Sequence, residues 1–370
     1  MQEEQLIAYR YRIYPTVEQI IYFAKCFGCV RFYWNKALEQ SNNNLENNNL
    51  ASFDTPAKYK KEFSFLKEID SLALANTQLN LQKAWRMYFK KDNDFGKPKF
   101  KKKRDGYPSY TTNNQNSTIK LSEKYLTIPK LKTPIKIKKH RDFDGVIRNV
   151  TIMKEPSGKY YASILVATNT YKKLDTPIND SIGLDLGITN LVTDSNGTKY
   201  ENIKTTKKYA KRKTKEQRKL FRKQYGSKNY EKQRIKAAKV DEKIRNVRKD
   251  YNNKLSSKIV AENQTIIVED LKIKNMIKNH HLAKSITDCA WGKFVNQLEY
   301  KCERNGRNFL KIDTYFASSK ICSCCGVKNP KIKNLSIRQW TCPCCNIEHD
   351  RDINAAKNIL NEGMKSLGTI

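Results

Sequence analysis

The stretch from Ser181 to Val192 constrains the fold most, because it combines a strand pattern with a charge that does nothing for strand stability. Its apolar residues alternate and predict one buried face: Ile182, Leu184, Leu186 and Ile188. Asp185 falls on the opposite face between Gly183 and Gly187, and two glycines would leave its carboxylate open to a ligand or metal ion. A simple strand-end Asp in a turn is the structural alternative.

A second acid follows a second strand pattern. The continuous run Thr265–Val268 is rich in β-branched residues and predicts a strand buried on both faces, in a sheet that helices cover. Glu269 comes directly after this run. It would therefore lie at the carboxyl end of a strand, which is where α/β sheets place their functional sites.

A third acid precedes the last helical pattern of the chain. An apolar stripe predicts a helix that begins near Ile353: Ile353, Ala356, Ile359 and Leu360. Asp352 could be the N-cap of this helix or could direct its carboxylate at a metal ion. Asp350 is the rival ligand; we favour Asp352 because it adjoins the helix that docks on the sheet.

The acids Asp185, Glu269 and Asp352 offer the hard oxygen ligands that Mg²⁺ prefers. Two such ions about 3.5–4 Å apart can activate water and stabilise the leaving oxygen in phosphodiester hydrolysis. The order strand–acid, strand–acid, helix–acid in an α/β domain is typical of ribonuclease-H-like nucleases.

Two Cys-x-x-Cys pairs have the spacing of a zinc ribbon. The predicted ligands close a tetrahedral, structural site: Cys322, Cys325, Cys342 and Cys345. Cys324 and Cys344 would point away from the ion. Disulfides are disfavoured because we find no signal peptide or membrane-span pattern and expect a reducing compartment. Cys26 and Cys29 form a lone pair inside a helical pattern and are interpreted as core thiols.

The formal net charge of +35 points to a polyanionic partner, and a nucleic-acid backbone is the ordinary one. Cations concentrate in a connector over 97–104 and in a helix-compatible segment over 204–258. One run within that segment is the densest: Lys207, Lys208, Lys211, Arg212 and Lys213. We interpret it as a nucleic-acid contact rather than a solvated helix face.

The first half of the chain predicts a β structure with a helical insertion. Residues 4–14 alternate like a strand, Thr16 can cap a helix over 17–43, and a second helix is expected over 71–91. An Asn-rich loop is expected over 41–49. Short alternating runs between 107 and 170 then predict a small barrel or curled sheet.

Taken together these motifs resemble the TnpB family of transposon-encoded RNA-guided nucleases, also known as OrfB transposases and similar to compact type V CRISPR effectors. Four motifs carry most of the resemblance: Ile-Gly-Leu-Asp185-Leu-Gly-Ile, Ile-Val-Glu269-Asp-Leu, Ser-Ser-Lys-Ile-Cys322-Ser-x-Cys325-Gly and Asp-Arg-Asp352-Ile-Asn-Ala-Ala-Lys-Asn. Three further matches lie near the front of the chain: Tyr11-Arg-Ile-Tyr-Pro-Thr-x-Glu-Gln, Arg31-x-x-x-Asn35 and His140-Arg141.

The resemblance implies a multidomain α+β protein. It implies a wedge-like β-barrel over 1–15 and 105–180, a helical recognition lobe over 16–104, and a RuvC-like, RNase H-like nuclease domain over 181–317 and 349–370. A zinc-ribbon domain that binds target nucleic acid would occupy 318–348, and the basic segment 204–258 would be a helical insert. Asp185, Glu269 and Asp352 would be the catalytic acids.

The resemblance also implies partners: a guide RNA from the transposon end, and double-stranded DNA next to a short transposon-adjacent motif. The protein would act in the cytoplasm of a bacterial or archaeal cell, associated with the nucleoid. Candidates for reading the adjacent motif are Asn76, Asn80, Thr111 and Asn113. Two other functions stay open: an RNA-using regulator of transposition that does not cut, and a structure-specific nuclease without RNA.

Overall fold

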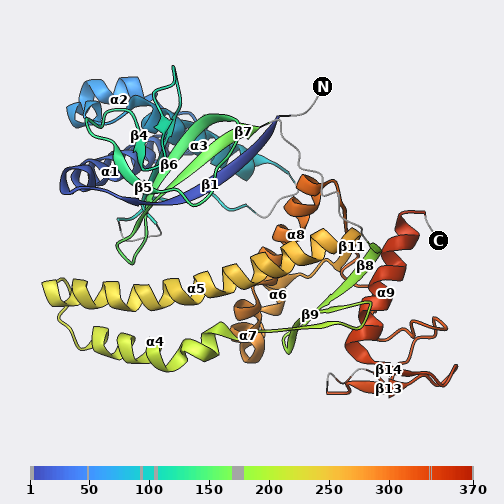
Figure 1. Ribbon diagram of the computed structural model, residues 1–370. Helices are drawn as coiled ribbons and strands as arrows, with labels where there is room; N and C mark the ends of the chain where they lie inside the picture. Colours follow the sequence, from blue (N-terminus) through green and yellow to red (C-terminus); the bar gives the residue numbers. More distant parts are fainter. Residues whose placement is uncertain are drawn as a thin grey trace. The chain divides into compact units, whose positions relative to one another are not determined.

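The computed structural model describes residues 4–47, 50–91, 95–103, 107–168, 179–332, 334 and 336–368 (Figure 1). The chain divides into two compact units, Met1–Thr170 and Tyr171–Ile370. Each unit has hydrophobic core residues of its own. Arg104 of the predicted connector and residues 48–49 of the predicted loop lie outside the described residues.

A seven-stranded antiparallel sheet forms the centre of the first unit, in the order β2-β6-β7-β1-β5-β4-β3. Its strands are β1 (Gln5–Tyr14), β2 (Ser109–Asn113), β3 (Lys120–Leu121), β4 (Tyr125–Thr127), β5 (Ile135–Lys138), β6 (Val146–Lys154) and β7 (Tyr160–Thr168). The N-terminal strand β1 lies between β5 and β7. Among the described residues no ladder joins the edge strands β2 and β3, so of the two predicted forms, a small barrel or a curled sheet, the structure has the open sheet.

The helical elements inserted between β1 and β2 share a core with this sheet, and α1 and α3 contact strand β2: α1 (Val17–Glu46), α2 (Pro56–Glu62), the 3-10 helix η1 (Ser64–Lys67) and α3 (Ser71–Phe89). Thr16 caps α1 as predicted, in a capping box with Gln19. The helix continues to Glu46, so the loop predicted from residue 41 begins later. Cys26 and Cys29 are buried core thiols as predicted, and burial raises the pKa of Cys26 to about 12.

The second unit contains a five-stranded sheet in the order β10-β9-β8-β11-β12. Its strands are β8 (Asn179–Leu186), β9 (Asn190–Asp194), β10 (Lys199–Glu201), β11 (Asn263–Glu269) and β12 (Asn308–Ile312). β11 runs parallel to β8 and β12. The stretch from Ser181 to Val192 is not one strand as its pattern predicted, because the chain reverses after Leu186 and β9 returns antiparallel to β8. A Cβ on Gly187 would lie 2.8 Å from the Asn190 carbonyl oxygen, so this turn needs glycine.

Helices cover both faces of this sheet (Figure 1). The predicted alternation is confirmed on one face, where Ile182, Leu184 and Leu186 pack with residues of α5 (Lys228–Glu262), α7 (His280–Cys289) and α8 (Trp291–Asn305). The other face carries α9 (Arg351–Ser366), whose Ile359 packs against Ile267 and Ile312. The remaining elements are α4 (Thr205–Phe221), α6 (Ile273–Met276), β13 (Gln339–Thr341) and β14 (Glu348–Asp350).

The predicted helical segment 204–258 consists of two helices that lie side by side, α4 and the longer α5 (Figure 1). They are joined through Gly226, which has φ +80°. In α4 only Thr205 is fully buried, so this helix is largely solvated. Within the described segments, no helix combines the length and apolar character needed to cross a lipid bilayer.

Helix α9 lies on the sheet at Gly183. A Cβ built on this glycine would lie 2.2 Å from the Ala356 carbonyl oxygen and 2.6 Å from the Leu360 nitrogen, both of which are backbone atoms of α9. Glycine is therefore required here for the close approach of a helix. The sequence pattern alone predicts a different role, in which this glycine leaves the Asp185 carboxylate open to a ligand.

Replacing Gly183 with alanine should lower the free energy of unfolding by roughly 1–3 kcal/mol, because the new methyl group would push α9 away from the sheet. Thermal or urea denaturation measures this loss. Gly28→Ala is the matched control, since a Cβ on this glycine of α1 would meet no atom within 4 Å. That variant should be unchanged or more stable, by up to about 1 kcal/mol. Equal stability of the two variants would contradict the packing argument.

Candidate functional site

Two of the predicted acids come together through the register of adjacent strands. The parallel pairing of β8 with β11 sets Gly183 opposite Ile267 and Leu184 opposite Val268. One residue further along, the same register brings Asp185 beside Glu269. Because side chains alternate between the two faces of a strand, both carboxylates lie on the α9 face of the sheet.

The third acid reaches the same place through α9. Ala356 touches Gly183, and Asp352 lies one helical turn before Ala356. Asp185 lies two residues beyond Gly183 in β8, and both steps cover about 5–7 Å. Asp352 is therefore brought opposite Asp185, and its Oδ1 also lies 3.3 Å from Nη1 of Arg338.

Asp350, the rival third ligand, caps the last helix. It is the N-cap of α9, and its Oδ1 accepts hydrogen bonds of 3.1 Å from the N–H groups of Asp352 and Ile353. Its Oδ2 lies 2.6 Å from Nζ of Lys199. Burial raises the pKa of Asp350, but the hydrogen bonds from Lys199 and Ile353 outweigh it and hold this pKa below the usual range. The alternative in which Asp352 caps the helix is wrong.

The clustered acids carry poorly compensated negative charge. The pKa of Asp185 is well above its ordinary value, first because of burial and then because Glu269 and Asp352 lie nearby; Arg351 and Arg338 oppose this only in part. Burial also raises the pKa of Glu269, against a hydrogen bond from Ser318 that lowers it. Such a site favours a cation, and its oxygen donors suit Mg²⁺.

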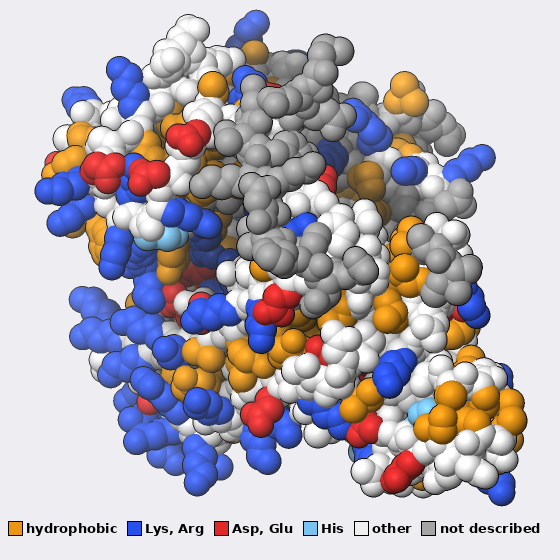
Figure 2. Space-filling model, turned by 45° about the vertical axis from the view of Figure 1, so that its right-hand side comes forward, with side chains coloured by type: hydrophobic (Ala, Val, Ile, Leu, Met, Phe, Trp, Pro, Cys, Tyr) orange, Lys and Arg blue, Asp and Glu red, His pale blue; other side chains and the backbone are white. Residues whose placement is uncertain are grey.

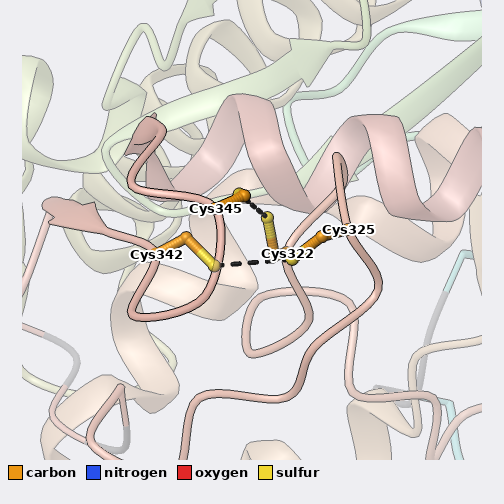
Figure 3. A group of neighbouring side chains, drawn as sticks. All are labelled: Cys322, Cys325, Cys342 and Cys345. Carbon is orange, nitrogen blue, oxygen red and sulfur yellow. Dashed lines mark hydrogen bonds between the residues drawn. The ribbon is translucent and has the colours of Figure 1, made fainter.

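The four predicted zinc ligands converge (Figure 3). Among the described residues, Cys322, Cys325, Cys342 and Cys345 are the one group of at least three His, Cys, Asp or Glu whose ligand atoms all lie within 4.8 Å of one another. Two Sγ–Sγ distances are 3.6 Å, from Cys322 to Cys345 and from Cys325 to Cys342. A tetrahedral Zn–S site with bonds of about 2.3 Å requires sulfurs about 3.8 Å apart, so the group fits zinc.

The two halves of this cysteine site repeat one backbone design. In each half the first cysteine's carbonyl accepts a bond from the N–H four residues later, from Gly326 at 2.9 Å and from Asn346 at 3.0 Å. Both of these residues have positive φ, +75° and +54°. Glycine adopts this conformation without strain, and asparagine tolerates it better than most other residues.

Thiolates at these four positions would repel one another. Backbone N–H groups of Cys345 and Cys344 lower the pKa of Cys342 to about 6, so one thiolate forms readily. The pKa of Cys345 rises to about 12: the N–H of Ile347 favours its thiolate, but burial and the neighbouring thiols outweigh it. Several thiolates together therefore need a cation. His349, which the sequence did not single out, adds Nε2 at 3.0 Å from Sγ of Cys322.

Three further residues near the acids were missed. Ser318 donates a hydrogen bond from its hydroxyl to Oε1 of Glu269. Asn354 and Asn358 are buried on α9, where their amides bond the chain between Ser318 and Ser323. The signal was present, because two asparagines four residues apart interrupt an otherwise apolar helix stripe.

The basic run on α4 divides into two parts. Lys207, Lys208, Lys211 and Arg212 are exposed, whereas Lys213 pairs with Asp241 of α5 at 2.8 Å. A shallow hollow of about 560 Å³ follows the same helix, lined by Lys211, Lys215, Arg218, Lys219 and Arg222 among others. Figure 2 shows Lys and Arg side chains crowded at the lower left, on the side where Figure 1 places α4 and α5.

The basic connector lies along α1. The indole N–H of Trp34 donates to the carbonyl of Lys99 at 3.0 Å. The amide of Asn35 bonds both the N–H and the carbonyl of Lys101, at 2.8 and 3.0 Å, and the Lys101 ammonium lies 3.6 Å from the centroid of the Trp34 ring. Lys99 and Lys101 are therefore held against α1 through their backbone, while most lysines of residues 97–103 stay exposed.

The candidates for reading DNA only partly converge. Nδ2 of Asn76 in α3 lies 3.2 Å from both the Thr111 carbonyl and Oδ1 of Asn113, on the edge strand β2. Asn80 is exposed one turn further along α3. Thr112, between the two candidates on β2, is buried and bonds Asp70, so this residue has a structural task.

Comparison with known proteins places these features in a family. The family model OrfB_IS605, described as "Probable transposase", matches residues 163–280, and "Cas12f1-like, TNB domain" matches 291–359. A "Helix-turn-helix domain" model matches 1–49, where the structure has β1 and the single helix α1. The fold resembles one solved chain, from "Cryo-EM structure of the Cas12f1-sgRNA-target DNA complex", with TM-score 0.51, 13% identity and coverage of 96% of this chain and 98% of that one.

Two relatives match over almost their full length. A protein of Streptomyces pristinaespiralis named "Putative RNA-guided DNA endonuclease" is 36% identical, over 98% of this chain and 91% of its own length. The Escherichia coli K12 protein named "Putative RNA-guided DNA endonuclease InsQ" is 30% identical, over 97% and 93%. With this identity across nearly the whole chain, the protein belongs to the TnpB-like, or OrfB, family.

Proposed function

We propose that this protein is an RNA-guided DNA endonuclease that hydrolyses phosphodiester bonds at Asp185, Glu269 and Asp352. The observation that carries the proposal is the meeting of these acids: adjacent parallel strands deliver two, and the helix packed on Gly183 delivers the third. The names of the two long relatives support the RNA-guided activity, since neither strand register nor charge alone specifies a guide.

Each acid would act as a metal ligand from a fixed position. Asp185 is set by β8, Glu269 by β11 and the Ser318 hydroxyl, and Asp352 by the first turn of α9. When bound, two Mg²⁺ ions would supply an activated water and neutralise the charge on the leaving oxygen. The raised pKa of Asp185 fits this role, because a carboxylate crowded by two others is stabilised once cations are present.

The cysteine group would hold one structural zinc ion and so keep the 318–348 segment folded. Its four thiols leave no ligand position open for catalysis. We propose that this segment contacts target nucleic acid, in keeping with its match to a TNB-domain model.

The exposed cations would bind the guide RNA, which we propose derives from the transposon end. Most lysines of α4 and of the connector 97–103 are exposed to solvent. The base-paired guide would select double-stranded DNA, leaving only a short flanking motif for the protein to read. Asn76, Asn80, Thr111 and Asn113 stay our candidates for that reading, and the wedge, recognition and nuclease boundaries stay as predicted from the sequence.

Asp185→Ala, Glu269→Gln and Asp352→Ala should each abolish DNA cleavage while RNA binding persists, because each removes a ligand of one shared site. Double variants should be hardly worse than single ones. Asp350→Ala should lose about 1 kcal/mol of stability with its N-cap but keep most activity. Single-turnover cleavage and thermal melting measure both effects.

If all three acid variants lose cleavage but keep guide-directed binding, misfolding is excluded as the cause. An inactive Asp350→Ala beside an active Asp352→Ala would reverse our choice of ligand.

Purified protein should contain about one zinc per chain by elemental analysis. Replacing Cys322, Cys325, Cys342 or Cys345 with serine should remove it, because three thiolates no longer close the tetrahedron. Cys324→Ser and Cys344→Ser are the matched controls and should retain the metal, since both thiols are exposed and outside the cluster. Active protein without zinc would contradict the structural role.

Replacing the guide segment of the bound RNA should redirect cleavage to a DNA that matches the new segment and carries the same flanking motif. Sequencing of cleaved DNA measures this change. Cleavage that follows DNA shape and ignores the guide would indicate a nuclease without RNA. Guide-directed binding without cleavage in Mg²⁺ would instead indicate a regulator.

The same preparation allows a test of the α4 cations. Replacing Lys207, Lys208, Lys211 and Arg212 with glutamine should weaken RNA binding across sequences and flatten its salt dependence, by about 0.7–0.9 in log–log slope for each phosphate that the variant no longer neutralises. The cleaved DNA sequence should not change. Lys213→Gln is the control, because the Lys213 ammonium already pairs with Asp241; it should alter the slope least.

A further inference from the structure

The chain that leads from the sheet into the cysteine site is fastened to α9 by two side chains. We call residues Ser318–Ser323 the strap. Nδ2 of Asn358 donates to the carbonyls of Ser318 and Ile321, at 2.7 and 2.6 Å. Asn354, one turn earlier, donates to the Ile321 carbonyl at 2.7 Å and accepts from the Ser323 N–H at 2.9 Å. The strap thus has a fixed position on the helix that carries Asp352.

The strap in turn reaches the acids. Ser318 is 7% exposed, and its hydroxyl donates to Oε1 of Glu269. Its own N–H bonds the Phe316 carbonyl and its carbonyl bonds Asn358, so the backbone on both sides of the hydroxyl is held. Because the backbone on both sides of Ser318 is held, its hydroxyl can fix the Glu269 carboxylate in one rotamer.

The asparagines are expensive to bury unless their amides are used. Asn354 and Asn358 are 1% and 4% exposed, and an alanine or leucine would fill the same helix stripe without an amide to satisfy. Every partner given above for these amides lies in the strap. This arrangement indicates that asparagine occupies these two positions because it holds the strap, and not for helix packing alone.

We propose that Ser318 is a positioning residue of the nuclease site, which sets the orientation of Glu269 and is itself held on α9 by Asn358. This inference rests on the proposed function, since it concerns a residue behind one of its acids. Residues that orient metal ligands in this way tune metal affinity by about 10–100-fold. Ser318 also directly joins the site to the chain that enters the zinc module four residues later at Cys322.

The test compares Ser318→Ala, Ser318→Thr and Ser323→Ala in complexes with RNA. Ser323→Ala is the matched control, because Ser323 binds Asn354 through its backbone N–H. Ser318→Ala should raise the Mg²⁺ concentration for half-maximal cleavage about ten-fold, and Ser318→Thr, which keeps the hydroxyl, should restore it. Zinc content and target DNA binding should stay as in the unmodified protein.

A second readout does not depend on cleavage. Binding of Mn²⁺ to the same complexes, followed by electron paramagnetic resonance of the free ion, should weaken by a similar factor in Ser318→Ala. The Glu269→Gln complex gives the background from ions bound elsewhere. Asn358→Ala should act in the same direction, and Asn361→Ala, exposed on the same helix, should not.

The outcomes separate this proposal from the proposed function. If the unmodified complex does not cut DNA, the endonuclease proposal fails, and Mn²⁺ binding still tests Ser318. If Ser318→Ala binds Mn²⁺ as the unmodified complex does, the positioning role is wrong. If Ser318→Ala loses zinc or cooperative melting, Ser318 is only a structural part of the strap and the proposal is overturned as well.

Discussion

The direct backbone contact between α9 and Gly183 is the constraint on which the rest of the second unit depends. Because no side chain separates helix from strand, the helix can approach until Ala356 touches the sheet. That depth fixes Asp352, one turn earlier, against Asp185. It also places Asn354 and Asn358 where they can hold the strap. A single missing methyl group thus sets the geometry of the acids and of the entry to the cysteine site.

Both candidate metal sites concentrate like charges that the protein alone does not balance. Burial and two neighbouring carboxylates raise the pKa of Asp185, and burial and the neighbouring thiols raise that of Cys345. The ligand types differ and so would the ions: carboxylates suit Mg²⁺, and four thiolates suit Zn²⁺. His349 contacts the candidate zinc ligand Cys322, and Ser318 contacts the candidate magnesium ligand Glu269. Each site therefore has a further residue that contacts one of its ligands.

The positive charge on α4 lies on exposed side chains, unlike the charge of the two candidate metal sites. α4 has few buried residues, and its exposed cations repel one another, so its contacts with α5 and its N-terminal anchor are important for its stability. The anchor is Asp288, which accepts hydrogen bonds from Thr205 and from the N–H of Thr206 in place of an N-cap side chain. A helix with so little core of its own is suited to neutralisation by a phosphate backbone.

The sequence alone determined which residues are candidate functional groups, because local chemistry is visible in spacing. Cys-x-x-Cys pairs, acids at strand ends and the density of lysines are all local signals. Only the tertiary structure decided between Asp350 and Asp352 as helix cap, since capping depends on where the first turn begins. It also showed that the strand through Asp185 reverses after Leu186, and it gave roles to Ser318, Asn354 and Asn358. Spacing marks the two asparagines as unusual, but their partners lie tens of positions away in the chain, and no local pattern encodes those contacts.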